Sequence, residues 1–336
     1  MIQQLTLLFL TTMIIIGVGQ DAQDSQVAPL PVGPGFDPKA IVGASECTEC
    51  HTHSAAIWEK SVHHGTITDM PRSEKGREIA KKMGIRRIKS ESLCLDCHST
   101  SHWEDEKLKP SSGVSCESCH GAGMGWVKLH GEFSGKEEGQ ETADEIARRW
   151  RASEAAGMLR PTMIADIARN CVSCHVVPHE ELVNVGGHPA GSDFELVAWS
   201  QGNIRHNNFY TKGKENKVAS IERQRLLFAV GMLAEMELLL KAVGTAEKMG
   251  DYAKANARRF AALRKKLAAA AKATSQPDLI KALEAVASLK LSLKNQEAIL
   301  AASESITASL DGLAATSNGS DLKGIDSMLP EEADYK

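Results

Sequence analysis

The sequence predicts a mainly α-helical protein in two parts, a loop-rich core over residues 41–212 and a helical bundle over residues 213–316. Three observations support this fold class. All eight cysteines lie in the first part. No run of alternating apolar residues there is long enough to predict a sheet. From about residue 217 onward, apolar residues recur at helical spacing. The length of 336 residues fits two domains.

Residues 1–20 are expected to form a signal peptide. Leu5 to Val18 is an apolar stretch with the length of a signal-peptide core, short for a membrane span. Gly17 and Gly19 are small residues suited to a cleavage site. Because no Lys or Arg precedes the stretch, an uncleaved anchor stays open as the alternative. Residues 21–40 are rich in Pro and Gly and predict an extended leader.

Composition excludes nucleic acid as a partner. The net charge is −4, whereas proteins that bind nucleic acid usually carry an excess of Lys and Arg. Aromatic residues make up 4% of the chain, fewer than we expect in a β-sandwich of this size. A helical core, or one filled by a cofactor, accommodates that composition.

Every cysteine belongs to a Cys-x-x-Cys-His pentapeptide, the pattern of covalent c-type haem attachment. Two thiols add across the two vinyl groups of haem, and the short tether then holds the following histidine under the iron as its proximal ligand. The sequence therefore predicts four covalently bound haem c groups. The attaching cysteines are Cys47, Cys50, Cys94, Cys97, Cys116, Cys119, Cys171 and Cys174, and the proximal ligands are His51, His98, His120 and His175.

Three other uses of paired cysteines fit less well. Disulfides are common in exported proteins but do not require a histidine after each pair. Zinc sites use Cys-x-x-Cys without that histidine. A thioredoxin-like motif occurs singly, near a βαβ pattern. Four motifs of one kind, with no cysteine left over, favour haem.

Eight further histidines supply candidates for the sixth ligand of each iron, and all lie at or before residue 206. His53, His102 and His179 follow a proximal histidine too closely to reach over the same haem, and His64 is expected to be a solvated neighbour of His63. The candidates with enough intervening chain to cap an iron are His63, His130, His188 and His206.

The motifs resemble the cytochrome c-554 family of tetrahaem cytochromes over roughly residues 40–210. After the first motif come Trp58 and then His63, five residues later. The third motif reads V-x-C-E-S-C-H-G-x-G, with His130 ten residues past its proximal histidine. The resemblance implies that His130 is an axial ligand of another motif's haem. It also implies one five-coordinate haem, at the second motif. The segment GGHPAGSDFEL is similar to one in related multihaem proteins and implies that His188 is a distal ligand.

Helical patterns account for the rest of the chain. The segment Thr142 to Leu159 opens with a capping box, in which Glu145 follows Thr142 by three residues. Beyond residue 217 the spacing predicts three or four helices in an antiparallel bundle, with Pro277 just inside one helix start, after Ser275. Residues 317–336 are short, acidic and partly aperiodic, and they are expected to form a disordered tail.

These features favour an electron carrier of the periplasm or extracellular space, which passes electrons between redox protein partners as in a respiratory chain. Two alternatives stay open: a multihaem oxidoreductase whose one open haem acts on a small nitrogen or sulfur species, and a subunit of a haem-wire assembly. Whether the chain is an enzyme is therefore undecided, with more weight on a carrier. Membrane association is expected only through an uncleaved N-terminus, and oligomerisation is left open.

Overall fold

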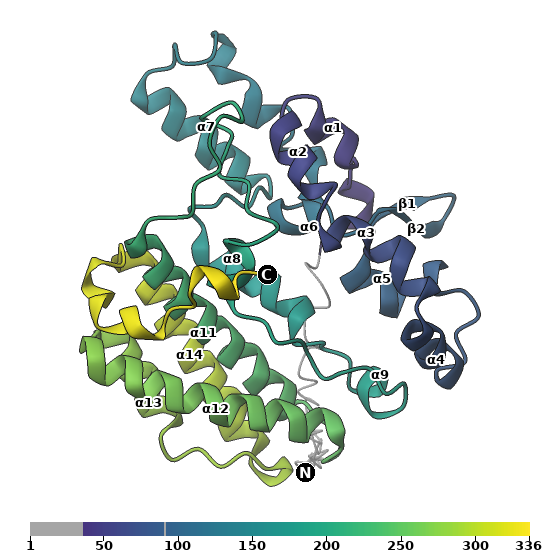
Figure 1. Ribbon diagram of the computed structural model, residues 1–336, viewed down its shortest axis with the longest axis vertical. Coiled ribbons are helices and arrows are strands. Elements are labelled where there is room, and N and C mark those ends of the chain that lie inside the picture. The colour runs from purple at the N-terminus through teal and green to yellow at the C-terminus, as the bar shows by residue number, and fades with distance from the viewer. Residues whose placement is uncertain (1–35, 91) are drawn as a thin grey trace, which may run out of the picture.

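The computed structural model describes residues 36–90 and 92–336. The expected signal peptide and most of the expected leader lie outside the described residues. The prediction of a mainly helical chain is confirmed, with short helices in the N-terminal half and long ones in the C-terminal half (Figure 1). Within the described part of the chain, no helix has the length and apolar character needed to span a bilayer.

The N-terminal half consists of short helices joined by loops. Helices this short are marginal in isolation, so they depend on packing for stability. Their bounds are α1 Ala44–Thr48, α2 Thr52–Trp58, α3 Val62–Asp69, α4 Glu74–Lys82, α5 Ser92–His98, α6 Cys116–His120, α7 Ala143–Ala155, α8 Ile164–His175, α9 Glu180–Asn184 and α10 Leu196–Ser200.

A small hairpin interrupts the helices. Strands β1 (Thr100–Glu104) and β2 (Lys107–Ser112) pair antiparallel. Asp105 and Glu106 form the two-residue turn, both with positive φ (49° and 59°), the conformation that matches the twist of a hairpin. Neither strand alternates apolar and polar residues, so the sequence pattern did not predict this sheet.

Helix α7 begins as predicted. The Thr142 hydroxyl accepts the backbone N–H of Glu145, and the Glu145 side chain accepts the backbone N–H of Thr142, so the capping box is confirmed. The helix ends at Ala155, four residues before the predicted end. A glycine with φ of +102°, Gly157, follows it.

Four helices form the C-terminal bundle, where the spacing predicted three or four. They are α11 (Ile221–Gly244), α12 (Asp251–Thr274), α13 (Pro277–Val286) and α14 (Gln296–Thr316). Helix α11 packs against α12 and α14, and α13 packs against both of these. Pro277 opens α13 as predicted, although Gln276 and not Ser275 caps the helix.

Helix α8 belongs to the same hydrophobic core as the bundle. It packs against α11 and α14, and its buried residues Ile164, Ala168 and Val172 share one cluster with Leu233 of α11 and Leu310 of α14. Arg169 on α8 adds an ion pair with the buried Glu237 of α11, at 2.8 Å. The fourth Cys-x-x-Cys-His motif therefore lies on a helix that the bundle supports.

The expectation of a disordered tail is wrong. Residues Ser320–Met328 form the 3-10 helix η8, in which Leu322 and Ile325 are fully buried against α11 and α12. The Asp326 carboxylate binds the Arg225 guanidinium, with Oδ2 2.8 Å from Nη2. Apolar residues at 322, 325 and 328 follow the period of three that a 3-10 helix presents on one face, which a search for the α-helical period overlooks.

Candidate haem-binding site

Each Cys-x-x-Cys-His motif adopts one turn of helix. Residues three and four apart share a face of a helix, so both thiols and the histidine of a motif point the same way. Helices α5 and α8 end at the histidine of their motif, and α6 coincides with the third motif. In the first motif, the backbone N–H of His51 donates to the carbonyl of Cys47 at 3.0 Å, which closes the same turn. All eight cysteines are free of disulfides.

Each of the four motif histidines faces one histidine from a distant part of the chain. A metal–nitrogen bond of about 2.0 Å on either side of one metal ion places the centroids of two imidazoles about 6 Å apart. The four observed separations match that spacing. The ring-centroid separations are 6.2 Å for His51 and His130, 6.4 Å for His175 and His63, 6.4 Å for His98 and His188, and 6.1 Å for His120 and His206.

The four facing histidines are the four predicted sixth ligands. His130 lies opposite the first motif, which is a different motif from the one it follows in sequence. His188 lies opposite the second motif, His206 opposite the third and His63 opposite the fourth. Among the described residues, no group of three or more His, Cys, Asp or Glu side chains could hold a bare metal ion. A pair of imidazoles fits a metal whose other ligands come from a porphyrin, so the residues present fit haem.

Hydrogen bonds fix the orientation of several of these rings. The Nδ1–H group of His120 donates to the carbonyl of Leu159 at 2.9 Å, and that of His206 donates to the carbonyl of Ile204 at 2.7 Å. His188 donates in the same way to the carbonyl of Pro189, at 2.8 Å. Such bonds leave Nε2 free as the metal ligand.

Two contacts orient His175 of the fourth motif. Its Nδ1 lies 2.7 Å from the hydroxyl of Ser192. Phe194 stacks on the ring, with centroids 4.3 Å apart, and Trp199 meets the ring edge-on at 5.0 Å. These side chains follow His188 closely in sequence, so a single segment, residues 188–199, contributes to two of the four sites.

Burial keeps the motif histidines neutral, the state in which imidazole binds a metal. Burial and then His188 lower the pKa of His98 to about 4. Burial, followed by His63, Arg259 and His98, lowers the pKa of His175 to about 4. Burial is also the main cause of the lowered pKa of His51 and of His120.

The cysteines show which sites are neighbours. Cys47 and Cys116 hydrogen-bond to each other, which joins the first and third motifs. Cys97 and Cys174 do the same for the second and fourth. Burial first, and then the nearby Cys174 of the fourth motif, raise the pKa of Cys119 of the third motif to about 12. The sites therefore follow one another in the order first, third, fourth, second.

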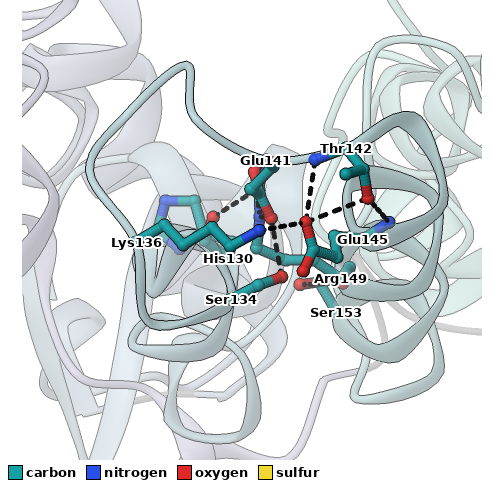
Figure 2. Close-up of polar contacts among 8 residues, drawn as sticks. All are labelled: His130, Ser134, Lys136, Glu141, Thr142, Glu145, Arg149 and Ser153. Atoms are coloured by element: carbon teal, nitrogen blue, oxygen red, sulfur yellow. Dashed lines mark hydrogen bonds and ion pairs between the residues drawn. The ribbon is translucent and has the colours of Figure 1, made fainter.

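An ion pair supports the backbone at His130 (Figure 2). The Arg149 guanidinium donates to the carbonyl of His130 at 2.6 Å and, through Nε, to the Glu141 carboxylate at 2.8 Å. It also lies over the rings of Phe133 and Trp150, 5.0 and 4.5 Å from their centroids. Arg149 is 19 residues from the histidine whose backbone it binds, so no local pattern in the sequence indicates this role.

A second ion pair near Arg149 joins Lys136 to Glu145 in the first turn of α7. The Glu145 carboxylate accepts hydrogen bonds from Lys136 at 2.7 Å and from the backbone of Thr142 at 2.8 Å (Figure 2). Lys136 first and Thr142 second lower the pKa of Glu145 to about 2. The loop after His130 is thereby attached to the start of α7.

Glu117, inside the third motif, is a second residue that the sequence analysis did not single out. It is fully buried, and its carboxylate accepts three backbone N–H groups, from Val42 at 2.9 Å, Gly43 at 2.8 Å and Gly123 at 2.7 Å. Amide donors replace the water that an ionised carboxylate loses on burial. Glu117 therefore fastens the segment before the first motif to the third motif.

The four remaining histidines face no motif histidine at this spacing. His64 meets the Trp58 ring edge-on, at 4.7 Å, and is exposed. His102 lies on β1, 3.3 Å from the Glu104 carboxylate. His53 lies against Gly213. Burial and then His188 lower the pKa of His179.

Residues 46–121 match the family model of cytochrome c554 and c-prime. The likeness is confined to this segment, and it implies haem c as cofactor and electron transfer as function. The match includes the first three motifs and His63. The fourth motif, His130, His188 and His206 lie beyond it. No curated protein and no solved structure matches the chain.

Proposed function

We propose that the chain is an exported tetrahaem c-type cytochrome that transfers electrons between redox proteins through closely packed haems. One observation carries the proposal: each of the four motif histidines faces a second imidazole at 6.1 to 6.4 Å. Imidazole on both faces of an iron leaves no position for a substrate. The axial ligands and their surroundings then set the reduction potential of each site.

Each site would take its residues from two parts of the chain. Haem c, when bound, supplies a one-electron iron couple. The protein supplies two thiols for attachment, two neutral imidazoles, and the hydrogen bonds that hold those imidazoles in place. The four sites are Cys47, Cys50, His51 and His130; Cys94, Cys97, His98 and His188; Cys116, Cys119, His120 and His206; and Cys171, Cys174, His175 and His63.

The enzyme alternative requires one open haem. The resemblance implies such a haem at the second motif, whose histidine is His98. In this chain His188 faces His98 at 6.4 Å, and the Nδ1–H···O=C bond to Pro189 holds the His188 ring in that position. This geometry favours a carrier over an oxidoreductase that acts on a small nitrogen or sulfur species.

The haem-wire alternative predicts a histidine that serves an iron of another chain. Each of the four motif histidines already faces a histidine of its own chain. His64 packs edge-on against Trp58. The arrangement therefore supports a chain that completes its own four sites. Because haem attachment of this type takes place outside the cytoplasm, we place the protein in the periplasm or extracellular space.

Electron paramagnetic resonance of the oxidised protein tests the proposal. We expect only low-spin ferric signals, and we expect the reduced protein to bind no carbon monoxide. A high-spin signal that integrates to one haem per chain would instead support the enzyme alternative. Because the second motif is where an open haem is implied, His188→Ala is the matched control that should create such a signal.

A further inference from the structure

The segment from Arg72 to Lys89 carries a dense positive charge. It contains eight Lys or Arg residues and two Glu residues, while the chain as a whole has 39 basic and 43 acidic residues. All eight basic side chains are exposed. We call this surface the basic face; its residues are Arg72, Lys75, Arg77, Lys81, Lys82, Arg86, Arg87 and Lys89.

Most of this charge is not neutralised by neighbours. Glu78 binds Lys82 at 2.7 Å and Lys75 at 3.4 Å, and both ion pairs are exposed. Over the described residues, no ion pair is found for the other six basic side chains. Exposed pairs of this kind contribute little to stability. The packing of α4 instead depends on Ile79 and Ala80, which are buried. The charges are therefore not needed for the fold.

The basic face lies next to the second haem site from both sides. The 3-10 helix η3 (Ile88–Ser90) packs against α5, which carries His98. At the end of α4, the Lys82 ammonium lies close to Gly187, the residue before His188. A Cβ added to Gly187 would be 3.3 Å from Lys82 Nζ. Each of the two chain segments that supply the facing histidines is thus bordered by residues of the segment Arg72 to Lys89.

The other basic stretch of the chain, on α12, is partly committed to internal contacts. Arg259 binds Glu235 at 2.6 Å and the carbonyl of Ala190 at 3.2 Å. Arg264 donates to the carbonyls of Val286 and Leu289. Those two guanidinium groups stabilise the bundle and the loop beyond His188, so fewer charges remain there for a partner.

We propose that the basic face is the docking surface for an acidic one-electron redox protein, and that electrons pass at the adjacent second haem site. This rests on the proposed function. Opposite charges on two surfaces raise the rate of encounter and orient the partners, and this steering weakens as salt rises. In each transfer, one electron moves between the haem iron and the partner, and each changes oxidation state by one.

The test compares two small oxidants of opposite charge on the intact, reduced holoprotein. Ferricyanide, an anion, takes one electron and becomes ferrocyanide as one haem iron goes from ferrous to ferric. Tris(phenanthroline)cobalt(III), a cation, takes one electron in the same way. The variant is Arg86→Glu, Arg87→Glu and Lys89→Glu together. The matched control, Lys265→Glu, Lys290→Glu and Lys294→Glu, makes the same charge change on exposed residues between Ile221 and Thr316, outside the basic face.

At about 10 mM salt, where the Debye length is about 30 Å, we expect the variant to slow oxidation by ferricyanide roughly tenfold or more. Oxidation by the cobalt complex should become faster. The control should match the wild type with both oxidants, and at about 1 M salt the differences should vanish. A milder variant, with Gln at the same three positions, should give an intermediate effect.

A binding measurement gives a readout that does not depend on electron transfer. Fluorescently labelled poly-L-glutamate, followed by anisotropy at low salt, should bind the wild type and the control, and binding to the variant should be lost. Equal behaviour of variant and control in both assays would overturn the proposal. So would a changed low-spin spectrum of the variant, because the cations would then serve the haem itself. If neither oxidant reacts with the wild type, it is the proposed function that fails.

Discussion

His130 is expected from the resemblance to be an axial ligand of another motif's haem, and in the structure it faces His51 of the first motif. If it is the sixth ligand opposite His51, His130→Ala removes one imidazole and leaves every thiol in place. We expect four haems still to attach, and one of them to become high-spin and to bind cyanide or carbon monoxide. Electron paramagnetic resonance and ligand titration measure both effects.

His64→Ala is the control for that substitution. The His64 side chain is exposed, meets the Trp58 ring edge-on and belongs to none of the four ring pairs. The substitution His64→Ala should leave the low-spin spectrum unchanged. An unchanged spectrum for His130→Ala as well would mean that the 6.2 Å pair with His51 does not enclose an iron.

Arg149 acts on the same site through the backbone of His130. Arg149→Met keeps the apolar stem of the side chain between Phe133 and Trp150 but removes the donors to Glu141 and to the His130 carbonyl. We expect a lower midpoint of unfolding in denaturant and a shifted low-spin signal for one haem. Loss of stability without any spectral shift would show that Arg149 supports only the fold.

The neighbouring Arg148 supplies the control for Arg149. Arg148 is exposed, and substitutions at exposed sites usually change the free energy of unfolding by no more than about 0.5 kcal/mol. Arg148→Met should therefore leave both the unfolding midpoint and the spectrum as in the wild type. Arg149→Lys should not restore the spectrum fully, because an ammonium lacks the planar fork that binds Glu141.

Individual elements differ in how well the sequence predicted them. The four helical motifs and the capping box of α7 follow from local spacing, which a sequence displays directly. The β1–β2 hairpin has no period-two pattern, and η8 has a period of three. Which histidine faces which motif depends on contacts between distant segments, such as those of His63 with His175, and local spacing holds no information about them.

Helix α8 shows how strongly two parts of the chain depend on each other. A chain that ends at Ser220 lacks α11 and α14, which cover the buried face of α8. We expect this shortened chain to lose the haem at Cys171 and Cys174, because exposed apolar residues would destabilise the helix that holds both thiols. Mass spectrometry of the intact chain counts the haems.

The boundary at residues 212 and 213 is the prediction that this truncation tests. If 41–212 is a self-sufficient haem domain, the shortened chain keeps four haems and a low-spin spectrum. If α8 requires the bundle, it carries three haems or fewer. The fully buried positions of Ala168 on α8 and Leu233 on α11, in one hydrophobic cluster, favour the second outcome.

At the scale of the whole molecule, the expected cofactor content is four haems per chain. The mass of the intact denatured protein should exceed that of the polypeptide by four haem groups, because thioether bonds survive denaturation. A mass that corresponds to two haems would contradict the assignment of all eight cysteines. Substituting Cys171 and Cys174 by Ser is the control, which should lower the count by one.

The order of the histidines along the chain has a consequence for biogenesis. One member of each ring pair comes first (His51, His63, His98 and His120), and the four partners follow in the same order (His130, His175, His188 and His206). The two histidines of every pair are therefore separated by members of the other pairs, and no pair can form before residue 130 has been synthesised.

Until then, an imidazole closer in sequence, such as His64 for the first motif, has the lower entropic cost as a ligand, because closing a shorter loop costs less entropy. Newly made chains should pass through wrongly ligated intermediates. Mild acid, which protonates free imidazoles, should release such chains and speed their maturation.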